Sequence, residues 1–254
     1  IGVKVLGSNG SGTFGQILSG ILWAADNGAD VANMSLGGGF AKAGSGRFVG
    51  LINKTFNYAK QKGMLIVVAA GNSSQDLQHN GNFNSDYCDA PHVICVSAVG
   101  LATPNGNPDT PSFFTNYGES VVSVAAPGGN ASFDAKGKIL VQRWIWGNDI
   151  ASWVWSLCAR RTIGGWKVID AKDPSKDVPG LTICSTANFL NGYIGTSQAS
   201  PHVTGLAASL IAKYGKGQPQ TIKHMIEQTT VPLDPSYGKI FGSGRISVTN
   251  ALGI

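Results

Sequence analysis

The chain has 254 residues, of which 43% are hydrophobic and 13% are charged, and its formal net charge is +5. This composition excludes a disordered chain and predicts one large globular domain, with two small domains as the less favoured alternative. The 19 Lys and Arg residues are scattered along the sequence, which argues against a nucleic-acid partner. No apolar run approaches the ~20 residues of a membrane-spanning helix, so we expect no membrane partner either.

The first hundred residues alternate short apolar runs with segments of helical periodicity. Strands are predicted at 3–6, 29–36, 64–70, 93–99 and 120–126, and helices at about 14–25 and 48–62. Apolar residues of the first helix recur with the i, i+3, i+4 spacing of one helix face, at Phe14, Ile17, Leu18, Ile21, Leu22 and Ala25. Those of the second helix are Phe48, Leu51, Ile52, Phe56 and Ala59. Strands that alternate with helices indicate βαβ units, so the predicted fold class is α/β with a mostly parallel central sheet.

From about residue 130 to 182 the sequence has no clean periodicity and contains five of the six tryptophans. We predict an irregular Trp-rich insertion with its own small core, inside a single domain that spans residues 1–254. Binding a partner or flanking a cleft is the alternative role for this insertion. Helical periodicity then returns, with Pro201 in the first turn of a helix and a further short helix at 219–229. The first of these helices presents a buried stripe of Val203, Leu206, Ala207, Leu210 and Ile211.

The four cysteines form no CxxC pair and have no zinc-like spacing to the histidines. We expect buried thiols. A bridge between Cys158 and Cys184 is the alternative if the protein is secreted.

A serine at the start of the helix near residue 200 has the setting of a nucleophile. Ser197 lies in GTSQASPH, residues 195–202, where the helix N-terminus favours negative charge and Gly195 lets a substrate approach the backbone. Asn72 follows the carboxyl end of the strand 64–70, the edge of a parallel sheet at which ligand sites gather. Because an amide can donate to an oxyanion, the pattern predicts Ser197 and Asn72 as one catalytic site.

These motifs resemble those of the subtilisin-like serine peptidases, the subtilase family. GTSQASPHVTGLAA is similar to the nucleophile motif of that family, and VVAAGNS is similar to its oxyanion-hole motif. The resemblance implies a three-layer subtilisin-like fold and a secreted or extracytoplasmic serine endopeptidase that needs no cofactor for its chemistry. Ser197 would be the nucleophile and Asn72 the side-chain donor to the oxyanion.

Two further segments, VKVLGSNGSG and VANMSLGG, resemble the family segments that pair with an extended substrate. A peptide or protein substrate added in this way is held through its backbone, as an extra strand. The resemblance implies that the substrate is contacted by Gly10, Ser11, Gly12, Ser35, Leu36, Gly37, Ala70 and Gly71.

The base of the catalytic site is the main departure from the family pattern. The Asp and His motifs of the family precede VKVLG, where this chain begins, so we expect an N-terminally truncated chain completed by an upstream segment or chain. His202 lies five residues after Ser197, about 140° around the helix, and we expect it to be buried and structural. His224 and His92 are also expected to be structural. His79 lies in the loop after the strand 64–70, for which a position at the border of the cleft is the hypothesis, so that it either replaces the missing base or is simply solvated.

A structural calcium site is a further implication of the resemblance. APHVICV and PDTPSFFTNYG resemble the calcium-site segments of proteinase K-like members of the family. The ligands would be the carbonyls of Pro91 and Val93 and the carboxylate of Asp109, since calcium prefers oxygen ligands. In the alternative interpretation Asp109 is a turn residue.

Three other functions were weighed against the peptidase. The α/β-hydrolases are excluded, because their order of serine, acid and histidine requires a histidine after Glu227 or Asp234, and none follows. A truncated subtilase fold acting as a weak esterase and a non-catalytic peptide-binding remnant both stay open.

Overall fold

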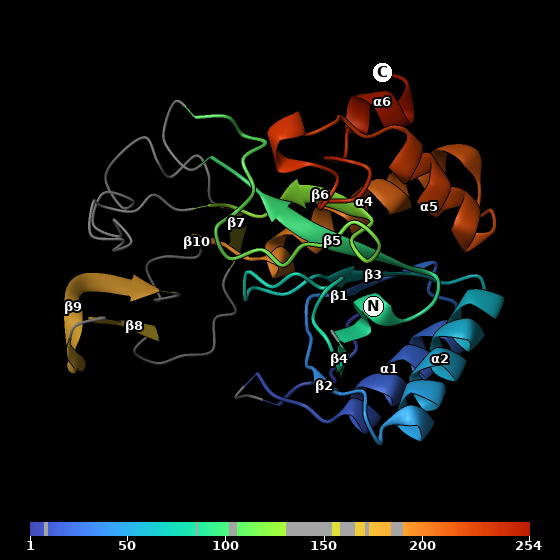
Figure 1. Cartoon of the computed structure of the whole chain (residues 1–254), viewed down its shortest axis with the longest axis horizontal. Coiled ribbons are helices and arrows are strands. Elements are labelled where there is room, and N and C mark those ends of the chain that lie inside the picture. Colours follow the sequence, from blue (N-terminus) through green and yellow to red (C-terminus); the bar gives the residue numbers. More distant parts are fainter. Residues whose placement is uncertain are drawn as a thin grey trace.

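In the computed structural model, a four-stranded parallel sheet forms the centre of the fold (Figure 1). The spatial order of its strands is β1 (Val31–Met34), β3 (Leu65–Ala69), β5 (Val93–Val99) and β6 (Val124–Pro127). In the register of this sheet, Val31 lies opposite Leu65, Ile66 opposite Val93, and Val96 opposite Val124. The structure describes residues 1–7, 10–84, 86–101, 106–130, 154–157, 166–170, 173–183 and 190–254.

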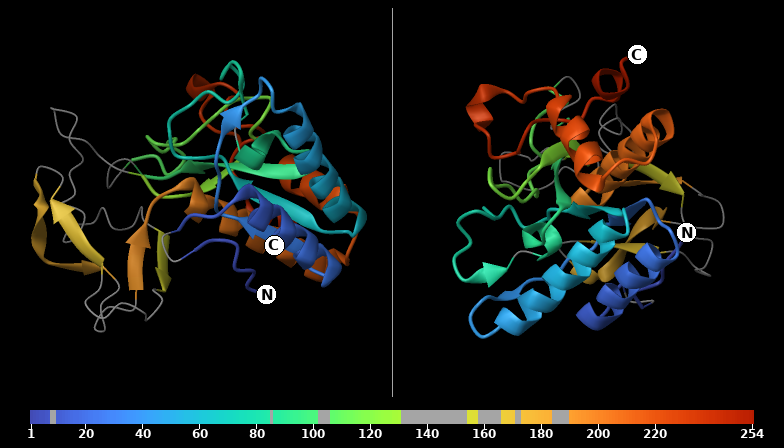
Figure 2. Two further views of the ribbon diagram at one scale, coloured as in Figure 1. Left: turned by 90° about the horizontal axis from the view of Figure 1, so that it is seen from below. Right: turned by 90° about the vertical axis from the view of Figure 1, so that its right-hand side faces the viewer.

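Helices cover both faces of this sheet, which confirms the three-layer α/β fold (Figures 1 and 2). The first face carries α1 (Phe14–Asp26) and α2 (Gly46–Gln61), and the second carries α4 (Thr196–Tyr214), α5 (Pro219–Gln228) and α6 (Val248–Leu252). Successive residues of β3 point to opposite faces, so Ile66 and Val68 pack with α1 and α2 while Leu65 and Val67 pack with α4 and α5. Every residue of β3 and β5 is buried, as their continuous apolar runs predict.

The predicted helices are confirmed, with two changes at the edges of their buried faces. Leu22 and Leu51, both predicted on the buried faces, are 36% and 52% exposed. Each is adjacent in sequence to a buried isoleucine, Ile21 before Leu22 and Ile52 after Leu51, and one residue turns a helix by about 100°. None of the helices in the described part of the chain is long and apolar enough to cross a membrane.

The prediction of a strand at residues 3–6 is wrong. This segment is extended along α1 and has no strand partner among the described residues, and a Cβ on Gly20 would lie only 2.4 Å from Cγ1 of Val5 and 3.2 Å from Cγ1 of Val3. Val3 and Val5 therefore bury their side chains against a helix while Lys4 stays exposed. An alternating pattern of burial therefore does not by itself identify a strand. A strand also needs a neighbouring backbone to pair with, whereas an extended segment packed on a helix shows the same alternation without one.

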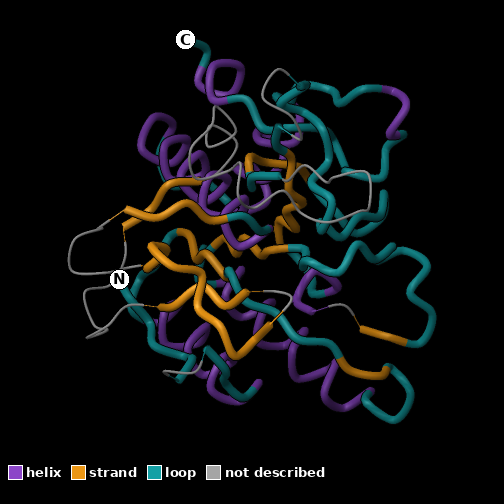
Figure 3. Tube along the Cα trace, turned by 90° about the vertical axis from the view of Figure 1, so that its left-hand side faces the viewer, coloured by secondary structure: helices purple, strands orange, loops and turns teal. Residues whose placement is uncertain are grey.

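Short strands extend the fold beyond the central sheet. β2 (Phe40–Ala41) pairs with β4 (Phe83–Asn84), and a 3-10 turn, η1 (Asp86–Asp89), follows; a second, η3 (Pro235–Tyr237), precedes α6. Two antiparallel pairs join β7 (Val154–Leu157) to β10 (Leu190–Tyr193) and β8 (Trp166–Asp170) to β9 (Asp173–Ile183) (Figure 3). The insertion predicted as irregular thus contains strands, whereas its predicted small core lies outside the described side chains.

A disulfide joins Cys88 of η1 to Cys95 of β5, with their Cα atoms 5.2 Å apart. Both residues are buried as predicted, at 6% and 0% exposure, but they are oxidised rather than free thiols. The sequence did not predict this pairing, because the two cysteines are only seven residues apart. They meet because the chain turns between η1 and β5. Cys158 and Cys184 lie outside the described residues.

Candidate active site

A cleft of about 400 Å³ opens where β1 and β3 end and α4 begins. Three parts of the chain meet there: residues 36–39 after β1, residues 69–75 at the end of β3 and beyond, and the first two residues of α4. Phe83 and Asn116 complete the wall. Among the described residues that line the cleft, none is charged, so the cleft is suited to a neutral group.

Ser197 is the second residue of α4 and faces this cleft. The N-cap of α4 is Gly195, whose backbone N–H donates to the carbonyl of Gly128 at 2.8 Å. In the part of the chain that the structure describes, the N–H of Ser197 has no acceptor, as expected in a first helical turn. The hydroxyl of Ser197 donates to the carbonyl of Ser35 over a long 3.4 Å. Ser197 thus presents a hydroxyl and an N–H on the same side of the cleft.

The orientation of the Asn72 side chain is set by Thr196. Asn72 Oδ1 accepts from the backbone N–H of Thr196 at 2.8 Å and from its Oγ1 at 2.9 Å. Thr196 is fully buried, and its Oγ1 also accepts from the N–H of Gly71 at 3.0 Å. Because both donors approach Oδ1, the Nδ2 group of Asn72 points the other way, and it lies 3.6 Å from where a Cβ on Gly195 would be. The structure therefore brings the Asn72 amide donor and Ser197 together.

The helix that carries Ser197 contains Pro201 at its sixth position, not in its first turn as predicted. Proline has no N–H, so the carbonyl of Ser197 loses its usual partner four residues ahead. Ser35 replaces that partner, since its Oγ donates to the Ser197 carbonyl at 2.7 Å. Ser35 also lies 3.0 Å from Oγ of the buried Ser200. The segment after β1 is thereby fixed to the helix of the candidate nucleophile.

We expect Ser35→Ala to lower the free energy of unfolding by about 1 kcal/mol, because the Ser197 carbonyl then has no donor in the helix. Urea unfolding measures the change. Ser209→Ala is the matched control, since Ser209 Oγ donates to the Gly205 carbonyl at 2.9 Å on the exposed side of the same helix, and we expect a change within about 0.5 kcal/mol. Equal losses in the two variants would contradict a special role of Ser35.

Of the predicted substrate-binding residues, Leu36, Gly37 and Gly71 line the cleft. Ala70 is buried and Ser35 is hydrogen-bonded to α4, and neither lines the cleft. Gly10, Ser11 and Gly12 lie exposed in the turn before α1 and do not line it either. Several lining residues were missed by the sequence analysis: Gly38, Gly39, Ser73, Gln75, Phe83, Asn116 and Thr196. The continuation of Gly37 into a run of three glycines was a usable signal, whereas Phe83 and Asn116 reach the cleft from distant segments.

The structure corrects one of the four histidine predictions. His202 is exposed, not buried, and its Nδ1 lies 2.9 Å from the carbonyl of Gln198 one turn earlier. His224, predicted to be structural, is exposed, and its Nδ1 lies 3.6 Å from Oε2 of Glu227. His92 has the local structural role predicted for it: Nε2 lies 2.9 Å from Asn57 Oδ1, and burial lowers the pKa of the imidazole, as do, to a smaller extent, nearby lysines.

His79 pairs with Asp76 outside the cleft. Its Nδ1 lies 2.8 Å from Asp76 Oδ2, and this hydrogen bond lowers the pKa of the Asp76 carboxyl. The His79 side chain is 73% exposed, and it is not among the residues that line the cleft with Ser197. The described residues therefore bring no histidine to the cleft.

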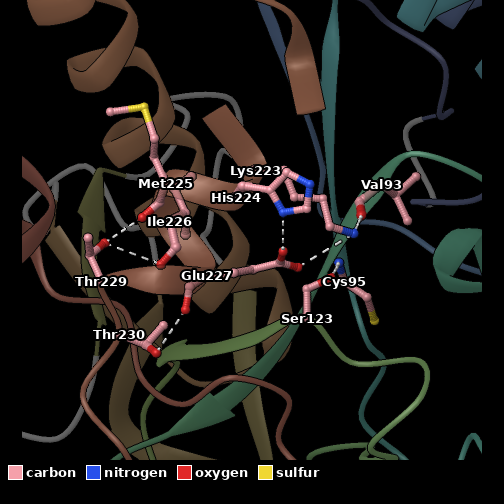
Figure 4. Close-up of polar contacts among 10 residues, drawn as sticks. All are labelled: Val93, Cys95, Ser123, Lys223, His224, Met225, Ile226, Glu227, Thr229 and Thr230. Atoms are coloured by element: carbon pink, nitrogen blue, oxygen red, sulfur yellow. Dashed lines mark hydrogen bonds and ion pairs between the residues drawn. The ribbon is translucent and has the colours of Figure 1, made fainter. Parts of the chain in front are cut away.

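Val93 and Asp109, two of the three predicted calcium ligands, are not brought together. The carbonyl of Val93 accepts from Nζ of Lys223 at 2.7 Å, and that ammonium lies 3.6 Å from Glu227 (Figure 4). Asp109 instead forms an ion pair with Arg245 near the far end of β5, where Gly100 bonds to Thr110. Because β5 has seven residues, its two ends are about 20 Å apart. No group of three His, Cys, Asp or Glu residues that suits a metal occurs among the described residues.

Comparison with known proteins places the chain among proteases. Residues 1–244 match the model described as the subtilase family. The chain is 29% identical to subtilisin DY of Bacillus licheniformis, over 98% of the chain and 66% of that protein. It is 30% identical to thermitase of Thermoactinomyces vulgaris, over 99% of the chain and 64% of that protein. The fold matches the epidermin leader peptide processing serine protease of Staphylococcus aureus with a TM-score of 0.74 at 21% identity, over 99% of this chain and 56% of that one. The chain thus spans slightly under two thirds of these two curated relatives.

Proposed function

Because the chain belongs to the subtilase family, whose members are serine peptidases, we propose that it takes part in peptide-bond hydrolysis as a serine endopeptidase. The observation that carries this proposal is the pairing of Ser197 with a pre-oriented Asn72 amide in one uncharged cleft. The substrates are peptides or proteins with a neutral side chain at the residue whose carbonyl is attacked, since no described charge in the cleft would select an ionised one.

In the proposed reaction, Ser197 Oγ attacks the carbonyl carbon and the negative charge moves onto the carbonyl oxygen. Asn72 Nδ2 and the N–H of Ser197 donate to that oxygen, and the N-terminus of α4 adds a favourable dipole. These donors are held in place before the substrate arrives, Asn72 by Thr196 and Ser197 by the helix. Pre-orientation means that little reorganisation accompanies the transition state.

The proton acceptor for Ser197 comes from outside the described residues in this proposal. The only described partner of its hydroxyl is a backbone carbonyl, which is too weakly basic to take the proton. We propose that an upstream segment or a separate chain supplies a histidine and the aspartate that orients it. Such a segment has a place to bind beside β1.

That place is a groove of about 860 Å³ along β1, which in the described sheet pairs on one side only, with β3. Val5 of the N-terminal segment, Ile21 of α1, Val31 of β1 and Ile211 of α4 contribute to its mostly apolar walls. An added strand would satisfy the free backbone groups of β1 and cover these side chains. The end of that strand would lie beside the cleft, since Leu36 lines both the groove and the cleft.

An oxidising compartment fits this proposal. A disulfide such as Cys88–Cys95 persists in extracellular or periplasmic proteins and is rare in the cytosol. We therefore propose a secreted or extracytoplasmic location. The calcium hypothesis is not part of the proposal, because Lys223 already occupies the carbonyl of Val93.

Labelling with a fluorophosphonate tests the proposal. We expect the reagent to modify Ser197 in the folded chain once the segment or chain that supplies the histidine is added, detected by peptide mass spectrometry, and to leave Ser197→Ala unlabelled. Ser73→Ala, which removes another hydroxyl from the same cleft, is the control and should be labelled as wild type.

Labelling, together with hydrolysis of a nitrophenyl ester and digestion of casein, separates the candidate functions. No labelling of the wild-type chain even with the segment or chain that supplies the histidine would favour a peptide-binding remnant. Hydrolysis of a nitrophenyl ester without digestion of casein would indicate an esterase. Equal ester hydrolysis by wild type and Ser197→Ala would contradict the assignment of the nucleophile.

A further inference from the structure

Asn116 lies buried against the cleft and binds the backbone on both sides of Asn72. Asn116 is only 5% exposed. Asn116 Oδ1 accepts from the N–H groups of Ser73 and Gln75, each at 3.0 Å, and its Nδ2 donates to the carbonyl of Ala70 at 2.8 Å. One amide therefore ties together the start and the end of the loop that carries Asn72.

Asn116 is itself firmly placed. Its backbone N–H donates to the carbonyl of Gly71 at 3.0 Å. Its carbonyl accepts from Oγ of Ser97 at 2.7 Å and from Oγ1 of Thr115 at 3.1 Å. Ser97 belongs to β5 and is fully buried, so the loop is anchored through Asn116 to the central sheet.

The loop needs such an anchor because its backbone is strained. Ser74 has a φ of +52°, a left-handed conformation that residues other than glycine rarely adopt. The residues on either side of it, Ser73 and Gln75, are the two whose N–H groups donate to Oδ1 of Asn116. Ser74 is also held by its own bonds to the carbonyls of Phe113 and Phe114. Without the bonds to Asn116, the residues on each side of Ser74 would lose their acceptor, and we expect Asn72, two residues before Ser74, to shift.

We propose that Asn116 is a positioning residue for Asn72: it fixes the backbone of the loop, while Thr196 fixes the rotation of the Asn72 amide. This inference rests on the proposed function, because it takes Asn72 as the donor to the oxyanion. Asn116 does not touch the reacting atoms in this account. It affects catalysis only by setting the position of the Asn72 donor.

The variant Asn116→Asp separates this role from general packing. Aspartate keeps the shape and the oxygen Oδ1 that accepts from Ser73 and Gln75, but sets a second oxygen against the carbonyl of Ala70 in place of a donor. Asn130→Asp is the matched control: Asn130 is 1% exposed, and its Nδ2 donates to the carbonyls of Gly100 and Pro111 at 3.1 Å. It makes a similar clamp without contacting the loop 70–75.

Steady-state hydrolysis of a nitrophenyl ester is measured for wild type, both Asp variants, Asn72→Ala, and Asn72→Ala combined with Asn116→Asp. We expect Asn116→Asp to lower kcat about tenfold, less than the loss of the whole donor, and to leave KM unchanged. Asn130→Asp should change kcat less than about twofold. In the Asn72→Ala background, Asn116→Asp should have no further effect on kcat, since it acts through Asn72. An equal loss with and without Asn72 would overturn the proposal.

Hydrogen exchange of the same proteins keeps this test independent of the proposed function. We expect faster exchange of the N–H groups of residues 71–75 in Asn116→Asp and not in Asn130→Asp. Unchanged exchange in this loop would overturn the proposal. A wild-type chain without ester turnover in the presence of the segment or chain that supplies the histidine would count against the proposed function alone. If Asn116→Asp does not fold, Asn116→Ser, which has a smaller acceptor and no carboxylate, is measured in the same way.

Discussion

Asn72→Ala is expected to lower kcat for an activated ester by about 10²–10³-fold, the loss known for removing a side-chain oxyanion donor in subtilisin, a relative of this chain. KM should stay within about twofold, because a donor that meets only the oxyanion stabilises the transition state and not the bound ester. Steady-state kinetics on the folded variant measures both constants.

Asn72→Asp sharpens this test. Aspartate keeps an oxygen where Asn72 Oδ1 accepts from Thr196, but it has no donor to offer the oxyanion. We expect a loss in kcat at least as large as in the alanine variant, whereas Ser73→Ala in the same cleft should change kcat less than about twofold. A rise in KM with kcat unchanged would contradict the role proposed for Asn72 and would indicate that it binds the substrate in its ground state.

Apolar patterning predicted which segments are buried better than which segments pair. The strands 64–70 and 93–99 were predictable because continuous apolar runs mark the centre of a covered sheet. The segment 3–6 alternates apolar residues with the exposed Lys4, and burial against α1 accommodates its valines without a neighbouring strand. Of the predicted strand 120–126, only the part from Val124 pairs, because the N–H groups of Val121 and Val122 are already turned back to the carbonyl of Gly118.

The candidate site was predictable where its signal is local. Ser197 at a helix start and Asn72 after a buried strand are read within a few residues each. The role of Asn116 was not predictable from a local pattern, since its partners in the loop lie more than 40 residues away in the sequence. The calcium prediction met the same limit: Lys223, which binds the carbonyl of Val93, is 130 residues distant from it.

Removing the Cys88–Cys95 disulfide, with both cysteines replaced by alanine, is expected to lower the free energy of unfolding by roughly 2–3 kcal/mol. The chain-entropy model gives this figure for a closed loop of seven or eight residues. Alanine is used because serine hydroxyls would be left without partners at two buried positions. Urea unfolding with and without a reducing agent measures the effect, and reduction should destabilise the wild type but not this variant. Equal destabilisation of both by the reductant would assign the effect to Cys158 and Cys184 instead.

The same disulfide also bears on the cleft, and in a way that differs from Asn72. Cys88 follows Phe83 by five residues, so the bridge to β5 holds the segment that brings Phe83 to the cleft wall. Asn72 and Ser197 are held separately, by Asn116, Thr196 and Ser35. We therefore expect the folded double-alanine variant to raise KM for a peptide substrate or an ester and to leave kcat nearly unchanged. A loss confined to kcat would mean that the disulfide, and not only the hydrogen bonds around Asn116, positions the oxyanion donor.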